Sequence, residues 1–327
     1  MKGAAWANGQ RSDLDVAIED LPALANDPAR LVWIDLCGLS TAQLQQVGAS
    51  LRLDAHSLED AQAPNERPKT TRFADYTFAT VYGASLSFQG DSASRVRLSR
   101  VSVYCLPSCL LTVRNVGGFD MTPVEQRWAD DPKLPAFGVD GLAQGLLDVA
   151  IDQQFDVLQA LDDDAETLTG YLFGDNPDVT ELQRRTFVIR REAVEMRRVV
   201  SPMRDVVSSL IRAGVADRGW NNELLSYYED LNDHVMRAVE WLDGLRDLVT
   251  SIFESGLALN DNRANQVMKK LAGWAAIIAV PTLITGWFGM NVPYFGFDTT
   301  AGFIGSSVAI LGGACTLWVV MRKKGWI

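Results

Sequence analysis

Two long uncharged apolar runs near the C-terminus constrain this chain more than any other feature. Residues 271–290 contain no Asp, Glu, Lys or Arg, and neither do residues 301–321. At 1.5 Å of rise per residue, each run is long enough to cross about 30 Å of hydrocarbon as a helix. Buried core helices are the alternative, but these rarely continue so far without a charge. The pattern predicts two transmembrane helices joined by an outer loop at 291–300.

Basic residues flank these runs on one side only. Lys269 and Lys270 precede the first run and the basic triplet 322–324 follows the second, whereas the loop has neither Lys nor Arg. The positive-inside rule therefore places both termini in the cytoplasm and the loop outside. The N-terminal segment lacks the apolar core of a secretory signal. We expect an integral protein of the plasma (inner) membrane.

Composition argues against several classes of function. The chain has four scattered cysteines without a CxxC pair and only two histidines, which disfavours a zinc enzyme and indicates a reducing compartment. It has no GxxxxGK[ST] and no GxSxG segment, so neither ATP use nor acyl transfer is indicated. With a net charge of −11, no nucleic-acid partner is expected. We expect a protein that is not an enzyme.

The first part of the chain, residues 1–135, reads as a cytoplasmic α/β domain. WIDL at 33–36 is typical of a short buried strand, and the alternating, aromatic-rich segment 73–88 also predicts a strand. RVRLSRVSVYC and CLLTVR predict a hairpin with Pro107 in its turn. TAQLQQVGASLRL, between these strands, has helical spacing.

The next part, residues 136–268, is predicted to be a helical hairpin and stalk, and residues 269–327 the transmembrane domain. Residues 134–183 carry eleven acids and no Lys or Arg, whereas residues 184–212 carry eight Arg against three acids. Asp148, Asp152 and Asp156 recur every four residues and share one helix face. This face is either neutralised by the Arg-rich helix packed against it or concentrates divalent cations, and the two interpretations are compatible.

One helix is expected from residue 221 to 291, because its spacing stays helical and runs directly into the first apolar run. Such a helix of about 71 residues would be roughly 105 Å long. A monomer cannot bury it, so it must pack against copies of itself or against the hairpin at 140–212.

If this helix lines a shared axis, counting back from Asn291 at about 3.6 residues per turn defines one uncharged stripe. Its members are Gly286, Thr282, Ala279 (or Ile278), Ala275, Leu271, Met268 and Ala264. The stripe suits either tight helix packing or a narrow pore with an apolar constriction. A ring of Asn291 amides could accept hydrogen bonds from the water of a hydrated Mg²⁺ ion without stripping it, although a helix C-cap is the simpler role for one Asn.

Several segments resemble the CorA family of magnesium transporters, in the same order and over most of the chain. The first apolar run closes on GMN, which is Gly289, Met290 and Asn291, and the preceding NRANQVMKKLAGWAAIIAVPTLITGWF is similar to that family's pore helix. HSLEDAQAPNERPKTTRFADYTF, SPMRDVVSSLIR and YYEDLNDH are similar to its cytoplasmic segments.

The resemblance implies an α+β membrane protein that forms a homopentameric funnel. Each copy would contribute an α/β N-domain, a long stalk helix that continues into the first of two transmembrane helices, and an outer second helix. The implied function is passive, channel-type transport of divalent cations, with Mg²⁺ as the main ion and Co²⁺ or Ni²⁺ as further ones. Its implied partners are further copies of the chain, membrane lipid and the cations themselves.

The resemblance also implies gating by intracellular Mg²⁺ bound between subunits. The acids of its regulatory site fall on Glu59 and Asp60, and their partner on a neighbouring stalk falls on Asp230, with Asp233 nearby. Acids of an auxiliary site fall on the already noted Asp148 and Asp152. Carboxylates of two subunits would repel until a cation bridges them. Surface ion pairing is the alternative role for Asp60 and Asp230.

Two departures from the family leave other functions open. The outer loop reads VPYFGFDTT, with Asp298 as its one acid, where the family usually has an acidic MPEL-type segment. The stripe has Ala264, Ala275 and Ala279 where bulkier or hydroxylated residues are common. Zinc transport, as in the similar ZntB branch, is therefore an alternative. A membrane-anchored oligomer that does not transport is a third.

Overall fold

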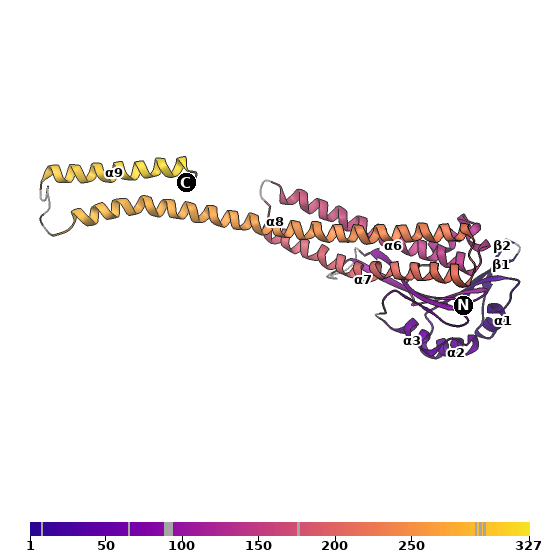
Figure 1. The fold of residues 1–327 in the computed structure, drawn as a ribbon. Coiled ribbons are helices and arrows are strands. Elements are labelled where there is room, and N and C mark those ends of the chain that lie inside the picture. Colours follow the sequence, from indigo (N-terminus) through magenta and orange to yellow (C-terminus); the bar gives the residue numbers. More distant parts are fainter. Residues whose placement is uncertain are drawn as a thin grey trace. The chain divides into compact units, whose positions relative to one another are not determined.

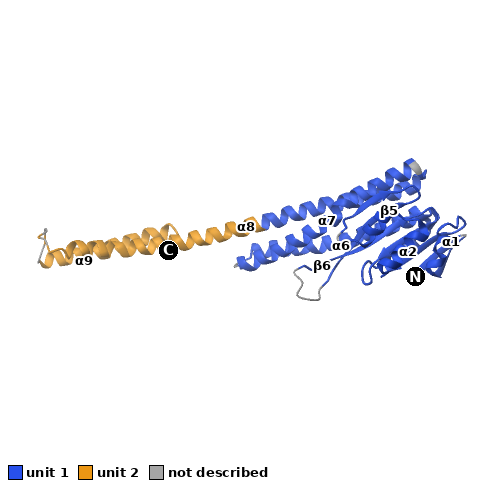
Figure 2. Ribbon diagram, turned by 90° about the horizontal axis from the view of Figure 1, so that it is seen from below, with its two compact units in different colours: residues 1–252 blue, residues 253–327 orange. Residues whose placement is uncertain are grey.

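The computed structural model (Figure 1) describes residues 1–7, 9–64, 66–87, 94–174, 177–291, 293, 296 and 299–327. The chain divides into two compact units, Met1–Ile252 and Phe253–Ile327 (Figure 2). This division follows contacts between residues. The boundaries predicted after residues 135 and 268 rest on changes in composition, which the division by contacts does not test, so they stay predictions.

The first unit is built on a seven-stranded sheet with the order β2-β1-β3-β7-β6-β5-β4. The strands are β1 (Lys2–Ala7), β2 (Gln10–Asp15), β3 (Leu31–Cys37), β4 (Lys69–Arg72), β5 (Thr77–Leu86), β6 (Val96–Cys105) and β7 (Cys109–Arg114). β3 and β7 pair in parallel, and the other neighbouring pairs are antiparallel. The predicted α/β character of this region is confirmed.

The predicted strands are found, with one correction. The strand expected at 33–36 lies within β3, and the predicted hairpin is formed by β6 and β7. The segment 73–88 does not begin as a strand, because the N–H of Phe73 donates to the carbonyl of Tyr76 at 2.9 Å and their rings stack 4.7 Å apart. This turn separates β4 from β5, and the end of the segment lies outside the described residues.

Helices cover both faces of the sheet. Neighbouring residues of a strand point to opposite faces, and both sets are apolar here, so each face needs a cover. On β3, Trp33 belongs to one apolar core and Ile34 to the other. The core of Ile34 is covered by η1 (Ile18–Asp20), α1 (Leu21–Ala25), α2 (Thr41–Leu51) and α3 (Ala55–Gln62). The core of Trp33 is covered by α4 (Thr122–Asp130), α5 (Lys133–Ala136), α6 (Val139–Leu172) and α7 (Val179–Asp217).

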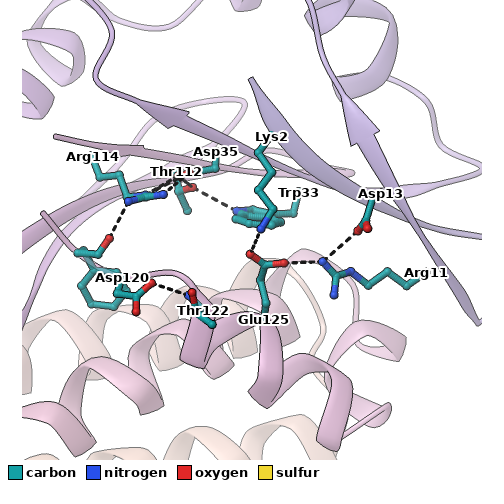
Figure 3. A network of polar contacts seen from close by, with 11 residues as sticks. Lys2, Arg11, Asp13, Trp33, Asp35, Thr112, Arg114, Asp120, Thr122 and Glu125 are labelled. Atoms are coloured by element: carbon teal, nitrogen blue, oxygen red, sulfur yellow. Dashed lines mark hydrogen bonds and ion pairs between the residues drawn. The ribbon is translucent and has the colours of Figure 1, made fainter. Parts of the chain in front are cut away.

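Polar contacts hold α4 against the sheet (Figure 3). Glu125 of α4 forms ion pairs with Lys2 of β1 and Arg11 of β2. Within the sheet, the carboxylate of Asp35 on β3 accepts hydrogen bonds from the guanidinium of Arg114 on β7 at 2.8–3.1 Å. The Asp35 side chain is 2% exposed, so this ion pair lies inside the folded unit.

The acidic face of α6 is not paired in the way predicted. Among the ion pairs of the described residues, Asp148 of α6 binds Arg127 of α4 at 2.8 Å rather than an arginine of α7. Arg197 of α7 instead pairs with Asp243, which lies in the following helix, at 2.7 Å. At least one arginine of the Arg-rich helix α7 therefore pairs with the following helix and not with the acids of α6.

The helix α8 (Asn222–Phe288) is continuous over 67 residues, close to the predicted range 221–291. Its first turns carry Leu224, Tyr228 and Leu231, all buried in the core that Trp33 shares. The second unit contains the rest of α8 and α9 (Thr300–Lys323), which lie side by side (Figure 2).

Both α8 and α9 contain a segment long and apolar enough to cross a membrane. Only 6% of that segment in α8, and none of it in α9, is buried within the chain. Core helices of soluble proteins bury such segments, so these exposed ones fit the predicted spans at 271–290 and 301–321.

Candidate functional site

The carboxyl end of α8 carries the three predicted filter residues. The N–H of Gly289 donates to the carbonyl of Thr285 at 2.9 Å, and the N–H of Met290 donates to the carbonyl of Trp287 at 3.3 Å. A Cβ on Gly289 would stand 2.9 Å from the Thr285 oxygen, closer than side chains normally come, so this turn favours glycine. Asn291 follows the turn directly and is exposed.

The predicted stripe is exposed along α8. Its residues Ala264, Met268, Leu271, Ala275, Ala279, Thr282 and Gly286 are all exposed in the single chain, as are Gly289 and Met290. The contacts with the end of the chain and with α9 lie elsewhere on the helix, at Gly273 and Val280. At about 100° per residue, the stripe centres roughly opposite these contacts. The chain's own second apolar helix therefore leaves this face uncovered.

The chemistry of this face is neutral and oxygen-bearing. The hydroxyl of Thr282 donates to the carbonyl of Ile278 at 2.9 Å, which leaves its oxygen free to accept hydrogen bonds. Asn291, which is exposed beyond the end of the helix, offers an amide carbonyl three residues after Phe288. Copies of this face around an axis would enclose a narrow path with neutral oxygen acceptors at one mouth. Asp298, the one acid of the loop, lies outside the described residues.

The predicted regulatory acids of the N-terminal part lie on α3. Glu59 is exposed, and the carboxylate of Asp60 lies 2.8 Å from the Lys69 ammonium, which also contacts Glu66 at 2.9 Å. Burial lowers the pKa of Lys69, but hydrogen bonds and charge from both carboxylates outweigh this and raise its pKa. The ammonium therefore stays charged at neutral pH, and Asp60 already has a cationic partner.

The predicted partner acids lie on α8. Asp230 and Asp233 are exposed, and Asp230 lies 3.7 Å from the Nε2 atom of His234 one turn later. Neither acid forms an ion pair with Lys or Arg among the described residues. These two carboxylates are thus open to a ligand or to another protein surface.

Asp148 and Asp152 lie one turn apart on α6, close to the Asp230 region of α8. Desolvation raises the pKa of Asp148, although the charges of Arg127 and His234 oppose this, and Asp230 raises it further. Desolvation also raises the pKa of Asp152, and the charge of Asp148 adds to it. The auxiliary acids and the α8 acids therefore share one negative field.

The sheet separates the two sets of regulatory acids within one chain. α3 contributes Ala61 to the core on its face, whereas α8 contributes Leu231 and Val235 to the core on the opposite face. In the part of the chain that the structure describes, no three His, Cys, Asp or Glu side chains are placed to hold a metal ion. Asp60 and Asp230 could share a cation only across two copies of the chain.

Sequence reasoning missed the cationic residues at these positions. Lys69 follows Asp60 in the segment that resembles the family, but spacing alone did not show that β4 returns to the end of α3. Arg127 comes from α4 and has no sequence link to Asp148. Only the tertiary contacts identify these two counter-ions.

Comparison with known proteins places this arrangement in a family. The family described as CorA-like Mg²⁺ transporter protein matches residues 28–323. The cobalt/magnesium transport protein CorA of Thermotoga maritima is 27% identical over 304 residues, which cover 92% of this chain and 85% of that protein. The zinc transport protein ZntB of Yersinia pseudotuberculosis is 24% identical over 276 residues, covering 80% and 77%.

The fold is also that of a solved structure. The complete CorA magnesium transporter from Methanocaldococcus jannaschii matches with a TM-score of 0.77 at 20% identity, over 100% of this chain and 99% of that one. The likeness covers the α/β region, the long helix and both apolar C-terminal helices.

Proposed function

The chain belongs to the CorA-like Mg²⁺ transporter family, and from that premise we propose that it is a passive channel for hydrated Mg²⁺. Members of this family are channel-type divalent cation transporters rather than enzymes. Co²⁺ and Ni²⁺ are further proposed cargoes, because a filter that contacts only the hydration water does not distinguish ions by direct coordination. Two charges moving through 100 mV gain about 4.6 kcal/mol, so inward flux needs no ATP.

The proposed assembly is a homopentamer with α8 around a central axis. The observation that carries it is the exposed, uncharged stripe from Ala264 to Gly286, on the side of α8 away from α9, with the exposed Asn291 following the end of the helix. A helix face with no charge and several small residues packs against copies of itself or surrounds a narrow path. In this arrangement α9 contacts lipid, and both termini lie on the cytoplasmic side of the plasma (inner) membrane, as the basic flanks 269–270 and 322–324 favour.

Asn291 acts as the filter in this proposal. Mg²⁺ demands six oxygen ligands in an octahedron and releases its water reluctantly. Amide carbonyls from several copies accept hydrogen bonds from that water and leave the inner shell intact. A ring of carboxylates would attract the ion more strongly but would also release it more slowly. Neutral oxygens thus favour throughput over tight binding.

Regulation by intracellular Mg²⁺ is proposed at the contact between neighbouring copies. Glu59 and Asp60 on α3 of one copy would face Asp230 and Asp233 on α8 of the next. Carboxylates are the hard oxygen ligands that Mg²⁺ prefers, and the exposure of three of these acids suits a shared site. Mg²⁺ bound there holds the copies together and the pore closed, and its loss lets them separate. Asp148 and Asp152 are proposed as an auxiliary site.

The filter is tested by substitution in liposomes. Asn291→Ala removes one acceptor from every copy, and since each hydrogen bond contributes about 1 kcal/mol, Mg²⁺ influx should fall at least about tenfold. Asn265→Ala, an exposed position of α8 outside the stripe, is the matched control and should transport like the wild type. Unchanged influx in the Asn291 variant would rule out the filter.

Zinc is the second candidate cargo. The similarity to a zinc transport protein and the single acid in the 291–300 segment both favour considering it. Zn²⁺ and Mg²⁺ influx should be measured in the same liposomes with and without a pH gradient. Influx of Zn²⁺ that exceeds that of Mg²⁺ and depends on the gradient would replace the magnesium proposal.

A further inference from the structure

Lys69 holds the Asp60 carboxylate that the proposed regulation assigns to Mg²⁺. Its ammonium lies 2.8 Å from an oxygen of Asp60 and 2.9 Å from an oxygen of Glu66. The three groups come from different elements, namely the start of β4, the end of α3 and the segment between them. A cationic group therefore already occupies the place beside Asp60 that a divalent cation needs.

This arrangement is partly sheltered from solvent. The side chains of Lys69, Asp60 and Glu66 are 33%, 24% and 23% exposed, so water screens their attraction less than on an open surface. Two carboxylates on one ammonium also fix its position better than a single pair would. Mg²⁺ can reach Asp60 only by displacing an ammonium or by binding beside it at a cost in repulsion.

The ammonium keeps one carboxylate partner when Asp60 is taken by another cation, because Glu66 also lies 2.9 Å from it. Lys69 also lines a hollow of about 320 Å³, together with Asp205 and two further cationic residues, Arg67 and Arg212. The two arginines disfavour entry of a third cation into this hollow, so Glu66 rather than Asp205 is the partner that remains to the ammonium. The lysine charge is thus balanced by two carboxylates without Mg²⁺ and by Glu66 alone once Mg²⁺ holds Asp60.

We propose that Lys69 is a tethered cation that competes with Mg²⁺ for Asp60 and thereby sets the Mg²⁺ concentration at which the channel closes. This inference rests on the proposed regulation between copies. Without Mg²⁺, Lys69 neutralises Asp60 inside one subunit. At high Mg²⁺, the dication replaces it and bridges to the neighbouring α8. The lysine therefore raises the concentration of Mg²⁺ needed for closure.

The test uses the full-length protein and neutral substitutions of the lysine. Lys69→Met and Lys69→Gln remove the competing charge, so the Mg²⁺ concentration that half-protects the protein from chymotrypsin should fall about tenfold. The same shift is expected for half-inhibition of flux by Mg²⁺ on the cytoplasmic side. Lys69→Arg keeps the charge and should stay within about twofold of the wild type.

Lys133→Met is the matched control. Lys133 forms an ion pair of similar length, 2.7 Å, with Glu223 in the same unit, away from Asp60. It should leave both half-points unchanged.

Asp60→Asn separates this inference from the function it rests on. A higher Mg²⁺ requirement in Asp60→Asn, with wild-type half-points in both neutral Lys69 variants, would overturn the competition but leave the regulatory site standing. If Asp60→Asn also kept the wild-type Mg²⁺ concentrations for half-protection and half-inhibition, both the competition and the regulatory site at Asp60 would be overturned.

Discussion

The two units of this chain treat their apolar side chains in opposite ways: the first buries them and the second leaves them exposed. In residues 1–252, large side chains such as Trp33 and Leu142 are fully buried between sheet and helices. In residues 253–327, Leu283 is 75% exposed and Phe303 is 72% exposed. The first unit thus carries its own core, whereas the second satisfies its backbone within helices and leaves its apolar side chains exposed, as membrane helices do. The comparison shows that the exposed apolar side chains of the second unit need an apolar environment that a single chain does not provide.

The largest expected effect tests how strongly the first unit depends on its interior. Asp35→Asn removes the charge that holds Arg114, and Thr112 also donates to this carboxylate at 2.8 Å (Figure 3). Leaving a partly buried guanidinium without its partner should lower the free energy of unfolding by about 3 kcal/mol. Urea denaturation of the full-length protein in detergent measures this.

Asp13→Asn is the control for that experiment. Asp13 is 79% exposed and lies 3.2 Å from Arg11, so its loss should cost less than about 0.5 kcal/mol. Equal effects of the two substitutions would contradict the idea that the buried pair matters because of its burial.

The next prediction applies one substitution to both units. Leu142→Ala creates a cavity in the core of the first unit and should cost about 3 kcal/mol. Leu283→Ala removes the same atoms from an exposed position of α8 and should change the free energy of unfolding by less than about 0.5 kcal/mol. Both are measured by urea denaturation followed by tryptophan fluorescence.

A different outcome would sharpen the comparison. If Leu283→Ala proved as costly as Leu142→Ala, the side of α8 that carries Leu283 would be buried in a protein contact between copies. Cross-linking of the variant would then reveal a weaker oligomer.

The smallest expected effect concerns the acidic face of α6. The pKa of Asp152 is raised in the folded chain by desolvation and by Asp148, so its ionisation costs stability once the pH rises through that pKa. At pH 7 without Mg²⁺, Asp152→Asn should therefore stabilise the protein by about 0.3 kcal/mol, a small gain because the site is exposed. Near pH 4 the gain should shrink, since the wild-type carboxyl becomes protonated.

Denaturation at the two pH values, with EDTA present, measures this difference. Asp163→Asn, at another exposed acid of α6, is the control and should show no gain at either pH. A loss of stability in Asp152→Asn at pH 7 would mean that its charge has a favourable partner in the assembled protein.

Elements defined by local periodicity could be predicted from the sequence, and those defined by distant contacts could not. The helix 222–288 follows from an uninterrupted spacing, and the β6–β7 hairpin from two apolar strands around Pro107. The start of β5 was missed because aromatic residues at 73–76 form a turn as readily as a strand. The pairing of Asp148 with an arginine of α4 was missed because helix charge alone does not identify a partner.

The candidate site divides in the same way. Which residues between Ala264 and Gly286 share one face of α8 could be predicted, because helical spacing fixes this, and their role in a pore stays a prediction. That α9 leaves this face open, and that Lys69 holds Asp60, could not be predicted, since both depend on where separate elements meet.

By itself, the sequence determined that two uncharged apolar runs lie near the C-terminus, that the first closes on Gly289, Met290 and Asn291, and which family the whole resembles. The length, charge and spacing of a segment are local properties, so they can be recognised without knowing its tertiary contacts. Only the tertiary structure decided that the sheet lies between Asp60 and Asp230 and that a lysine forms an ion pair with the first of them. Both depend on contacts between residues far apart in the chain, and the periodicity of the sequence does not predict such contacts.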